Sequence, residues 1–485
     1  MVFSAAIFLF LFLPVLLGLH FLSPHRLRNA LLLVASLLFY AWGEKTYILV
    51  LLASIAVNYT MGRWLDSATG SRRRRWGLAL AVAVNLGLLA YFKYGVFLLD
   101  NVNVARAALK LSPLPVPNLH LPLGISFFTF HALSYVIDVY RREVRALKDP
   151  FTFALYISFF PQSIAGPIVR YRDLAAQLVR RRVCREGFAE GVRRFVLGLS
   201  KKMLIANTLA VPADAIFALP SEALPSGMAW LGILCYTLQI YFDFSGYSDM
   251  AIGLAKMFGF DFKENFEYPY IARSITEFWR RWHISLSSWF RDYLYIPLGG
   301  NCRGALRTYL NLLIVFFLCG LWHGASWAFV CWGLYHGSFL VLERMGAGRL
   351  LERAWTPLRR VYTLLVVLIG WVFFRATTFA QAKFFLAALF GLGSAVGADY
   401  PTAVYLHTDV MLALLAGVLF SAPLRPLLQR LGHNVLEFAQ PRGRWASALD
   451  LVVAGTSAAA YAVLLSASAM LLAAGTHNPF IYFRF

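Results

Sequence analysis

The sequence predicts an all-α membrane protein that crosses the bilayer many times. Hydrophobic residues make up 59% of the 485 positions and charged residues only 14%, whereas soluble globular proteins carry about 25% charged residues. The charges gather between long apolar runs, which is the pattern of a polytopic membrane protein. At about 20 residues for each crossing, the apolar runs predict roughly 11–13 transmembrane helices.

The net charge of +21 has two readings. In a soluble protein it would favour nucleic acid as a partner. In a membrane protein the same excess of Lys and Arg anchors cytoplasmic loops. We therefore expect membrane lipids, and no nucleic acid, around this chain. The five cysteines show no CxxC pair and no metal-ligand spacing, so no disulfide framework is expected.

The N-terminal helices are predicted at 1–140. A short basic loop follows the first span, and Arg72–Arg75 follow the third. By count both loops lie on one side, and the positive-inside rule makes that side the cytoplasm. The N-terminus is then periplasmic, and Phe3–Leu22 is a first span rather than a removed signal peptide. The predicted spans are 5–23, 29–42, 46–64, 77–98 and 121–139, with an external loop at 100–120.

A catalytic core is predicted at 150–345, and it contains two irregular stretches. Residues 150–168 are apolar, but Pro161, Gly166 and Pro167 interrupt them. Backbone groups freed in this way cannot face lipid, so we expect a re-entrant element. Residues 273–297 mix Arg with Trp and Tyr, which predicts an amphipathic interfacial segment. The spans of this core are predicted at 190–214, 226–256, 305–322 and 325–342.

The C-terminal helices are predicted at 359–485. Basic residues in the loops 344–360 and 425–444 favour the cytoplasm. About twelve crossings then place the tail 477–485 in the periplasm. With no soluble segment or long repeat, residues 1–485 form a single transmembrane domain. The predicted spans are 359–376, 407–423 and 449–473, with 379–393 lying flat on the membrane.

Several polar residues lie within the predicted spans. We expect Lys93, in span 77–98, to extend its ammonium group toward the interface. Asp243, Ser245 and Asp249 share the span 226–256, and polar groups at that depth should face a wet interior or polar partners. The two aspartates either brace neighbouring helices or line a substrate path.

His323 is the candidate catalytic residue. Histidine is the side chain whose pKa suits proton transfer near neutrality, and Trp322 and Trp327 would wall a dry site around it. The chain has no Gly-x-Ser-x-Gly elbow and no His-Glu-x-x-His zinc motif. A hydroxyl of the substrate could therefore be the nucleophile, with His323 as its base. The alternative is a buried histidine that makes a hydrogen bond between helices.

His283 is the second candidate. Its arginine neighbours should disfavour an imidazolium, so a neutral ring is expected that orients an acyl donor or assists His323. The alternative is an interfacial histidine that only makes a hydrogen bond. His336 is expected to pack. No metal is expected, because no carboxylate or thiol is spaced to complete a site with these three histidines.

Several motifs together resemble the membrane-bound O-acyltransferase family, and within it the bacterial branch that acetylates extracellular polysaccharides. The resemblance covers essentially the whole chain. The motifs are Phe278-Trp279-Arg280-Arg281-Trp282-His283, Leu321-Trp322-His323-Gly324, Pro161-Gln162 with Gly166-Pro167, Tyr241 to Asp249, Tyr295 to Gly300, Met1 to Ser4 and Phe480-Ile481-Tyr482-Phe483.

The resemblance implies a fold and a set of site residues. The invariant histidine of the family falls on His323, and its second motif residue falls on His283. Relatives form a ring of tilted helices around a central tunnel. There a cytoplasmic donor, expected to be acetyl-CoA, meets an acceptor from the other side, and no bound cofactor is implied. The expected substrate or donor path includes Trp322, Arg280, Arg281, Trp282, Asp243, Ser245 and Gln162.

The resemblance also implies a function. It is the transfer of acetyl across the bacterial inner membrane for O-acetylation of an exported polysaccharide. Alginate is the favoured glycan, with cellulose or peptidoglycan as alternatives. Because the chain has no soluble domain, periplasmic acetyltransferase or acetyl-carrier proteins are the expected partners. The alternative of another class is a transporter or flippase of an acylated carrier, which internal repeats would favour; none is apparent.

Overall fold

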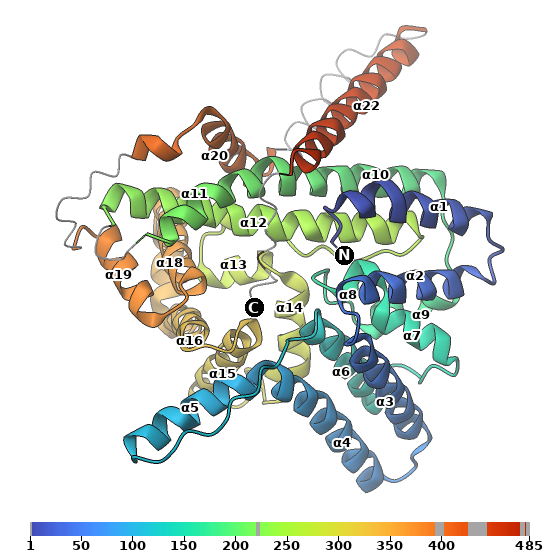
Figure 1. Cartoon of the computed structure of the whole chain (residues 1–485), viewed down its shortest axis with the longest axis horizontal. Coiled ribbons are helices and arrows are strands. Elements are labelled where there is room, and N and C mark those ends of the chain that lie inside the picture. The colour runs from blue at the N-terminus through green and yellow to red at the C-terminus, as the bar shows by residue number, and fades with distance from the viewer. Residues whose placement is uncertain (1, 220–223, 393–401, 425–443, 476–480, 482–485) are drawn as a thin grey trace.

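The chain folds as a helical protein (Figure 1). The computed structural model describes residues 2–219, 224–392, 402–424, 444–475 and 481. Every regular element in this described part is a helix, which confirms the predicted all-α class. The predicted basic loop 425–444 and the tail 477–485 lie outside the described residues, apart from Arg444 and Ile481.

The apolar helices confirm a multi-pass membrane protein. Within the described residues, six helical stretches are long and apolar enough to cross a bilayer, and four shorter apolar helices accompany them. The six stretches are Ile48–Ser67, Ser71–Ala108, Arg185–Phe217, Ala305–His323, Thr356–Arg375 and Leu451–Ala473. The four shorter ones are Phe8–Leu22, Arg28–Gly43, Phe379–Leu389 and Thr408–Phe420.

The N-terminal helices run from residue 8 to residue 141. The predicted loop 100–120 begins later than expected, because the helix after the π-helical turn η2 continues to Ala108. Figure 1 shows that α4 and α5 point in different directions on either side of this turn. The elements are η1 Phe8–Phe12, α1 Leu13–Leu22, α2 Arg28–Gly43, α3 Ile48–Ser67, α4 Ser71–Leu89, η2 Ala90–Tyr94, α5 Gly95–Ala108 and α6 Ile125–Arg141.

The predicted re-entrant element is broken and buried. Helix α7 (Pro150–Ser158) stops before Phe159, the short helix α8 (Phe160–Ser163) follows, and a non-helical segment leads to α9 (Tyr171–Val179). Residues 159–170 are all buried. The Ser36 hydroxyl accepts a hydrogen bond from the Phe160 amide (3.1 Å). Protein groups thus satisfy irregular backbone that lipid could not.

Two long helical stretches cross the molecule side by side (Figure 1). One comprises α10 (Arg185–Ser200), η3 (Lys201–Ala206) and α11 (Asn207–Phe217), and the other is α12 (Ser226–Met257). Glycines bring their backbones together: a Cβ on Gly198 would lie 2.5 Å from the Gly246 carbonyl oxygen, and one on Gly246 would lie 2.7 Å from that of Gly198. Small residues of this kind permit close helix packing in membranes.

Ion pairs add a second link between these helices. Lys202 Nζ lies 2.6 Å from Asp243 Oδ1, with both side chains 2% exposed. Asp249 pairs with Arg194 (2.6 Å) and Lys201 (2.7 Å). Asp243 also accepts a hydrogen bond from the amide of Ile481 (2.9 Å). The two aspartates therefore make the bracing contacts that were one of their two predicted roles.

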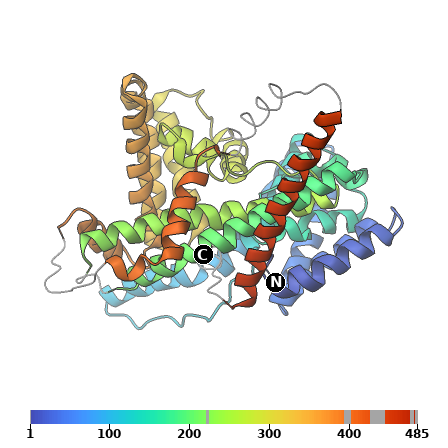
Figure 2. The same ribbon diagram turned by 90° about the horizontal axis from the view of Figure 1, so that it is seen from above.

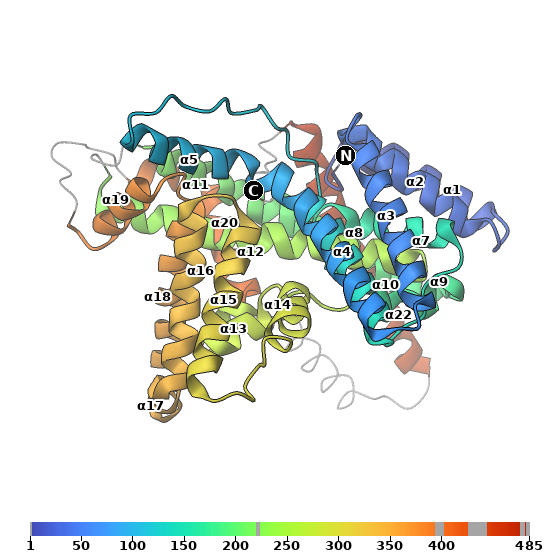
Figure 3. The ribbon, with the colours of Figure 1, turned by 90° about the horizontal axis from the view of Figure 1, so that it is seen from below.

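The remaining helices pack around the two long helical stretches and the N-terminal helices. Figure 3 shows α15, α16 and α18 side by side, with the short α13 and α14 between them and the N-terminal helices. Helix α22 packs against α10, where Ser468 donates to Ser200 (3.4 Å), and Figure 2 shows it crossing that helix. The elements are η5 Pro269–Ile271, α13 Ile275–Arg281, α14 Ile284–Phe290, η6 Arg291–Tyr295, α15 Ala305–His323, α16 Trp327–Leu342, η7 Glu343–Ala347, α17 Gly348–Arg353, α18 Thr356–Arg375, α19 Phe379–Leu389, η8 Thr402–Tyr405, α20 Thr408–Phe420 and α22 Arg444–Ala473.

The glycine contact predicts a selective sensitivity to one methyl group. Gly198→Ala should lower the stability of the protein by about 1–3 kcal/mol, because overpacking forces backbones apart. Gly87→Ala, also within a helix but with no atom within 4 Å of the added Cβ, should be neutral or slightly stabilising. The measurement is thermal unfolding in detergent, followed by loss of the monodisperse peak. Equal behaviour of the two variants would contradict the packing argument.

Candidate active site

His283 occupies a sharp turn between two short helices. Helix α13 ends at Arg281 and α14 begins at Ile284. His283 itself has φ 45° and ψ 54°, the left-handed region. Non-glycine residues adopt this region rarely, and it is enriched at functional sites. The predicted amphipathic segment 273–297 is broken into short helices. It buries Phe278, Trp282 and His283 almost completely, while Arg280 and Arg291 are exposed.

The His283 side chain is held by hydrogen bonds on one edge. Its Nδ1 lies 3.1 Å from Asn265 Oδ1 and 3.4 Å from the Ser285 hydroxyl. Ser285 in turn accepts a hydrogen bond from the Ile168 amide (3.0 Å), which ties the re-entrant segment to this turn. Burial lowers the pKa of His283 to about 3. Burial therefore disfavours the imidazolium, and the cause is burial rather than the neighbouring arginines.

His323 lies at the end of α15, where close helix packing fixes its position. Gly320 and Gly333 bring α15 and α16 together, since a Cβ on either would clash with a carbonyl oxygen of the other helix. Gly324 ends the helix, and any side chain there would collide with the ring of Phe329. His323 is 3% exposed.

Aromatic rings connect the two histidines. Trp322 lies 5.0 Å from the His323 ring and 6.2 Å from the His283 ring, measured between centroids. Trp332 and Phe374 close the other sides of His323, at 5.0 and 5.2 Å. His283 and His323 are near enough to interact electrostatically. The structure thus brings together both predicted catalytic histidines and Trp322.

Lys93 reaches the same place from η2. Its Nζ donates to the carbonyl oxygens of Trp322 (2.5 Å) and His323 (3.3 Å), and the Tyr94 hydroxyl donates to that of Leu321 (2.8 Å). These carbonyls are among the last of α15, which no helical amide can reach. The expectation that Lys93 extends toward the interface is wrong, because its ammonium group caps this helix end instead.

A cavity of about 620 Å³ lies beside His323. Its wall includes Trp322, His323 and residues 120–127, which lead into α6. Glu44 receives hydrogen bonds from His120 (3.2 Å) and from the Leu123 amide (3.2 Å) at this wall. The polar lining consists of Glu44, Lys93, His120, Ser126 and His323.

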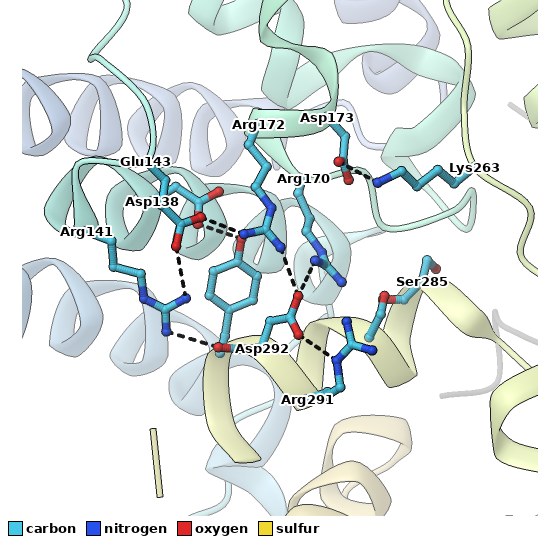
Figure 4. Close-up of polar contacts among 12 residues, drawn as sticks. Asp138, Arg141, Glu143, Arg170, Arg172, Asp173, Lys263, Ser285, Arg291 and Asp292 are labelled. Atoms are coloured by element: carbon cyan, nitrogen blue, oxygen red, sulfur yellow. Dashed lines mark hydrogen bonds and ion pairs between the residues drawn. The ribbon is translucent and has the colours of Figure 1, made fainter. Parts of the chain in front are cut away.

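An arginine cluster secures the segment after α14 (Figure 4). The Asp292 carboxylate pairs with Arg170 (2.5 Å), Arg172 (2.9 Å) and Arg291 (2.7 Å). Burial by itself would raise the pKa of Asp292, but the hydrogen bond from Arg291 and the charge of Arg170 hold it below its usual range. The cluster joins η6 to α9 and to the segment that follows α8.

The other predicted path residues are spread around this centre. Trp282 is buried against Phe266, a neighbour that His283 shares. Arg281 pairs with Glu277 (2.9 Å), whereas Arg280 is exposed. The remaining three are buried: Gln162 donates to the Tyr156 carbonyl, Asp243 pairs with Lys202, and Ser245 lies on α12 next to Phe244, which contacts His283.

The three histidines do not form a metal centre. No group of three or more His, Cys, Asp or Glu side chains suited to a metal occurs within the described residues. His336 packs on α18, where Gly370 leaves room for its ring, and lies 5.2 Å from Trp279.

Sequence reasoning missed three residues of this site. Lys93 carried a usable signal, because a charged residue within an apolar run marks function. Asn265 and Ser285 carried none, since one stands in an irregular polar stretch and the other is a common helix-start residue.

Two buried histidines share an aromatic wall within a broken helical core, and one of them, His323, borders a cavity. This arrangement is suited to acyl transfer away from water. Residues 75–386 match the model of MBOAT, the membrane-bound O-acyltransferase family. The chain belongs to this family and is an O-acyltransferase of the membrane.

Named relatives cover the whole chain. It is 43% identical to the "probable alginate O-acetylase AlgI" of Azotobacter vinelandii and 42% identical to that of Pseudomonas aeruginosa, each alignment covering 100% of both proteins. It is also 37% identical to a "peptidoglycan O-acetyltransferase" of Helicobacter pylori, over 81% of this chain and 80% of the relative.

The cap on α15 predicts a role for Lys93 in holding His323. Lys93→Met removes charge-assisted hydrogen bonds worth about 1.5–3 kcal/mol, so acyl transfer should fall about 10–150-fold. Tyr94→Phe removes one neutral bond worth about 1 kcal/mol and should cost roughly 5-fold. The measurement is acyl transfer by membranes with matched protein levels. Full activity of Lys93→Met would contradict the role.

Proposed function

We propose that this protein is an inner-membrane O-acetyltransferase. In this proposal it passes acetyl from cytoplasmic acetyl-CoA across the membrane for O-acetylation of an exported polysaccharide. The observation that carries the proposal is the position of His323, which borders both the cavity and the aromatic wall that it shares with His283.

The positive-inside rule supports a periplasmic approach for the acetyl acceptor and a cytoplasmic approach for the acetyl donor. With Arg72–Arg75 in the cytoplasm and the N-terminus in the periplasm, Glu44 and His120 fall at the periplasmic face. The cavity wall at 120–127 would then admit the acceptor from outside. The Asp292 cluster falls at the cytoplasmic face, next to Arg141. The donor would approach from that side.

The proposed chemistry uses His323 as a base that aromatic rings shield from bulk water. An acceptor hydroxyl gives its proton to His323 as its oxygen bonds to the acetyl carbonyl carbon. The carbon–sulfur bond of the thioester breaks, and the proton passes to the departing thiolate. The products are an acetyl ester and free CoA. His323 could instead carry the acetyl group transiently, in which case the first products are acetyl-histidine and CoA.

The relatives support a choice of glycan. Those at 42–43% identity are named for alginate, and that at 37% for peptidoglycan. We therefore propose alginate, with peptidoglycan as the second possibility; cellulose has no support among these relatives. We further propose that periplasmic acetyltransferase or acetyl-carrier proteins receive the acetyl group.

His323→Gln should lower the acetyl ester content of the exported glycan at least about 100-fold, because a general base contributes factors of about 100 to 10,000. His25→Gln, at an exposed histidine after α1, is the matched control and should leave the ester content unchanged. The measurement is ester content at equal protein levels in the membrane. The glycan that loses its ester identifies the acceptor.

Unchanged ester in His323→Gln would remove His323 from the chemistry and favour the transporter alternative. Proteoliposomes of the purified protein supplied with acetyl-CoA separate the two classes further. A transferase releases CoA in a manner that depends on His323, whereas a flippase of a preformed acylated carrier releases none.

A further inference from the structure

We propose that Asn265 is a positioning residue that fixes His283 as the tautomer with hydrogen on Nδ1, so that Nε2 presents a lone pair inside the site. This inference rests on the proposed function and on a role for His283 in acyl transfer. It adds Asn265, a residue to which the proposed function gives no role.

The orientation of the Asn265 amide is set by a backbone group. The Ser285 amide lies 3.2 Å from Asn265 Oδ1. A backbone N–H can only donate, so this side-chain atom must be the oxygen, and a flipped amide would set two donors against each other. The nitrogen of the same amide donates to the Ser248 hydroxyl on α12 (3.0 Å). Asn265 is fully buried.

The Ser285 hydroxyl is assigned next. It accepts from the Ile168 amide (3.0 Å) and lies 2.8 Å from Asn265 Oδ1. Because Oδ1 has no hydrogen, the hydroxyl must donate its single hydrogen there. It therefore has none left to offer His283.

Both neighbours of His283 Nδ1 are then acceptors. These are Asn265 Oδ1 at 3.1 Å and the Ser285 oxygen at 3.4 Å. A bare nitrogen between two acceptor oxygens would be unsatisfied, so Nδ1 must carry the hydrogen. In a neutral imidazole the other nitrogen then carries the lone pair.

The lone pair lies in a confined and mostly apolar space. Within the described part of the chain, no donor or acceptor contacts His283 Nε2, which is buried. Phe244 from α12, Phe266 from the segment before α13, and Trp322 from α15 surround the ring. His323 lies near enough to interact with the ring electrostatically. Nε2 therefore keeps a lone pair that can accept a proton or a hydrogen bond.

A purely structural role for Asn265 is the competing explanation. Its backbone oxygen accepts a hydrogen bond from the Ile284 amide (2.9 Å), and its side-chain oxygen accepts one from the Ser285 amide. Together these bonds cap the start of α14. Loss of activity in an Asn265 variant would thus prove little, and the test must read the tautomer and the protonation of His283.

The first experiment determines the tautomer of His283 in the protein alone, with no acyl donor or acyl acceptor added. Protein labelled with ¹⁵N-histidine is examined in lipid bilayers by solid-state NMR, and His283→Gln identifies the resonances of His283. We expect a protonated Nδ1 and a bare Nε2 that persist from pH 8 down to about pH 5, since burial opposes the charged form. A hydrogen on Nε2 in the neutral ring would overturn the proposal.

The second experiment reads protonation through the rate. Asn265→Asp keeps an acceptor for all three donors but adds a negative charge beside Nδ1. A carboxylate stabilises the imidazolium, so the acidic limb of the pH–rate profile should move upward by about 1–3 pH units. The rate is CoA release from acetyl-CoA by membranes equilibrated on both sides. Ser248→Ala, which also removes one hydrogen bond of Asn265, is the control and should not move the profile.

The outcomes separate this inference from the proposed function. An Asn265→Asp profile identical to the parent profile would make Asn265 structural, even if His323 is required. Full activity of His283→Gln would instead remove His283 from the reaction, and the role of Asn265 with it. If no CoA is released by the parent protein, the proposed donor is wrong, and the NMR result alone decides the tautomer.

Discussion

Backbone groups that leave a helix inside a membrane protein must find partners within the protein, because lipid offers none. The centre of this molecule is built around that constraint. The last α15 carbonyls accept hydrogen bonds from Lys93 and Tyr94. The first amides of α13 donate hydrogen bonds to the carboxylate of Glu343 (2.6 and 2.9 Å). The first amides of α14 donate to Asn265. These three helix ends are therefore closed by residues that lie outside the helix concerned, through side chains and, for Asn265, also through its backbone oxygen.

The same closures place the chemistry. A helix that stops in the interior exposes polar groups there, and the side chains that satisfy them become fixed neighbours of the last residue. His323 is the last residue of α15, and His283 directly precedes α14. Polar groups that stabilise the fold are in this way also those that hold the histidines, so a substitution at one of them can affect both stability and positioning.

The sequence was informative where the physical signal is local. Apolar run lengths predict the helical class, and prolines at 161 and 167 predict the broken element, because each effect depends on a few adjacent residues. The cap formed by Lys93 joins residues 229 apart, and the Asn265–Ser248 bond depends on how α12 passes the turn. The same limit applies to Gly198 and Gly246, since close helix packing is a property of the pair.

The bond from the Ile481 amide to Asp243 carries a consequence for biogenesis. The two residues are 238 positions apart, and Asp243 is already paired with Lys202 on the neighbouring helix. At synthesis rates of about 5–20 residues per second, α12 waits roughly 12–48 s for this partner. The Asp243 carboxylate can thus accept this bond only after residue 481 has been synthesised, so a product cut short before that residue would lack one hydrogen bond in its core.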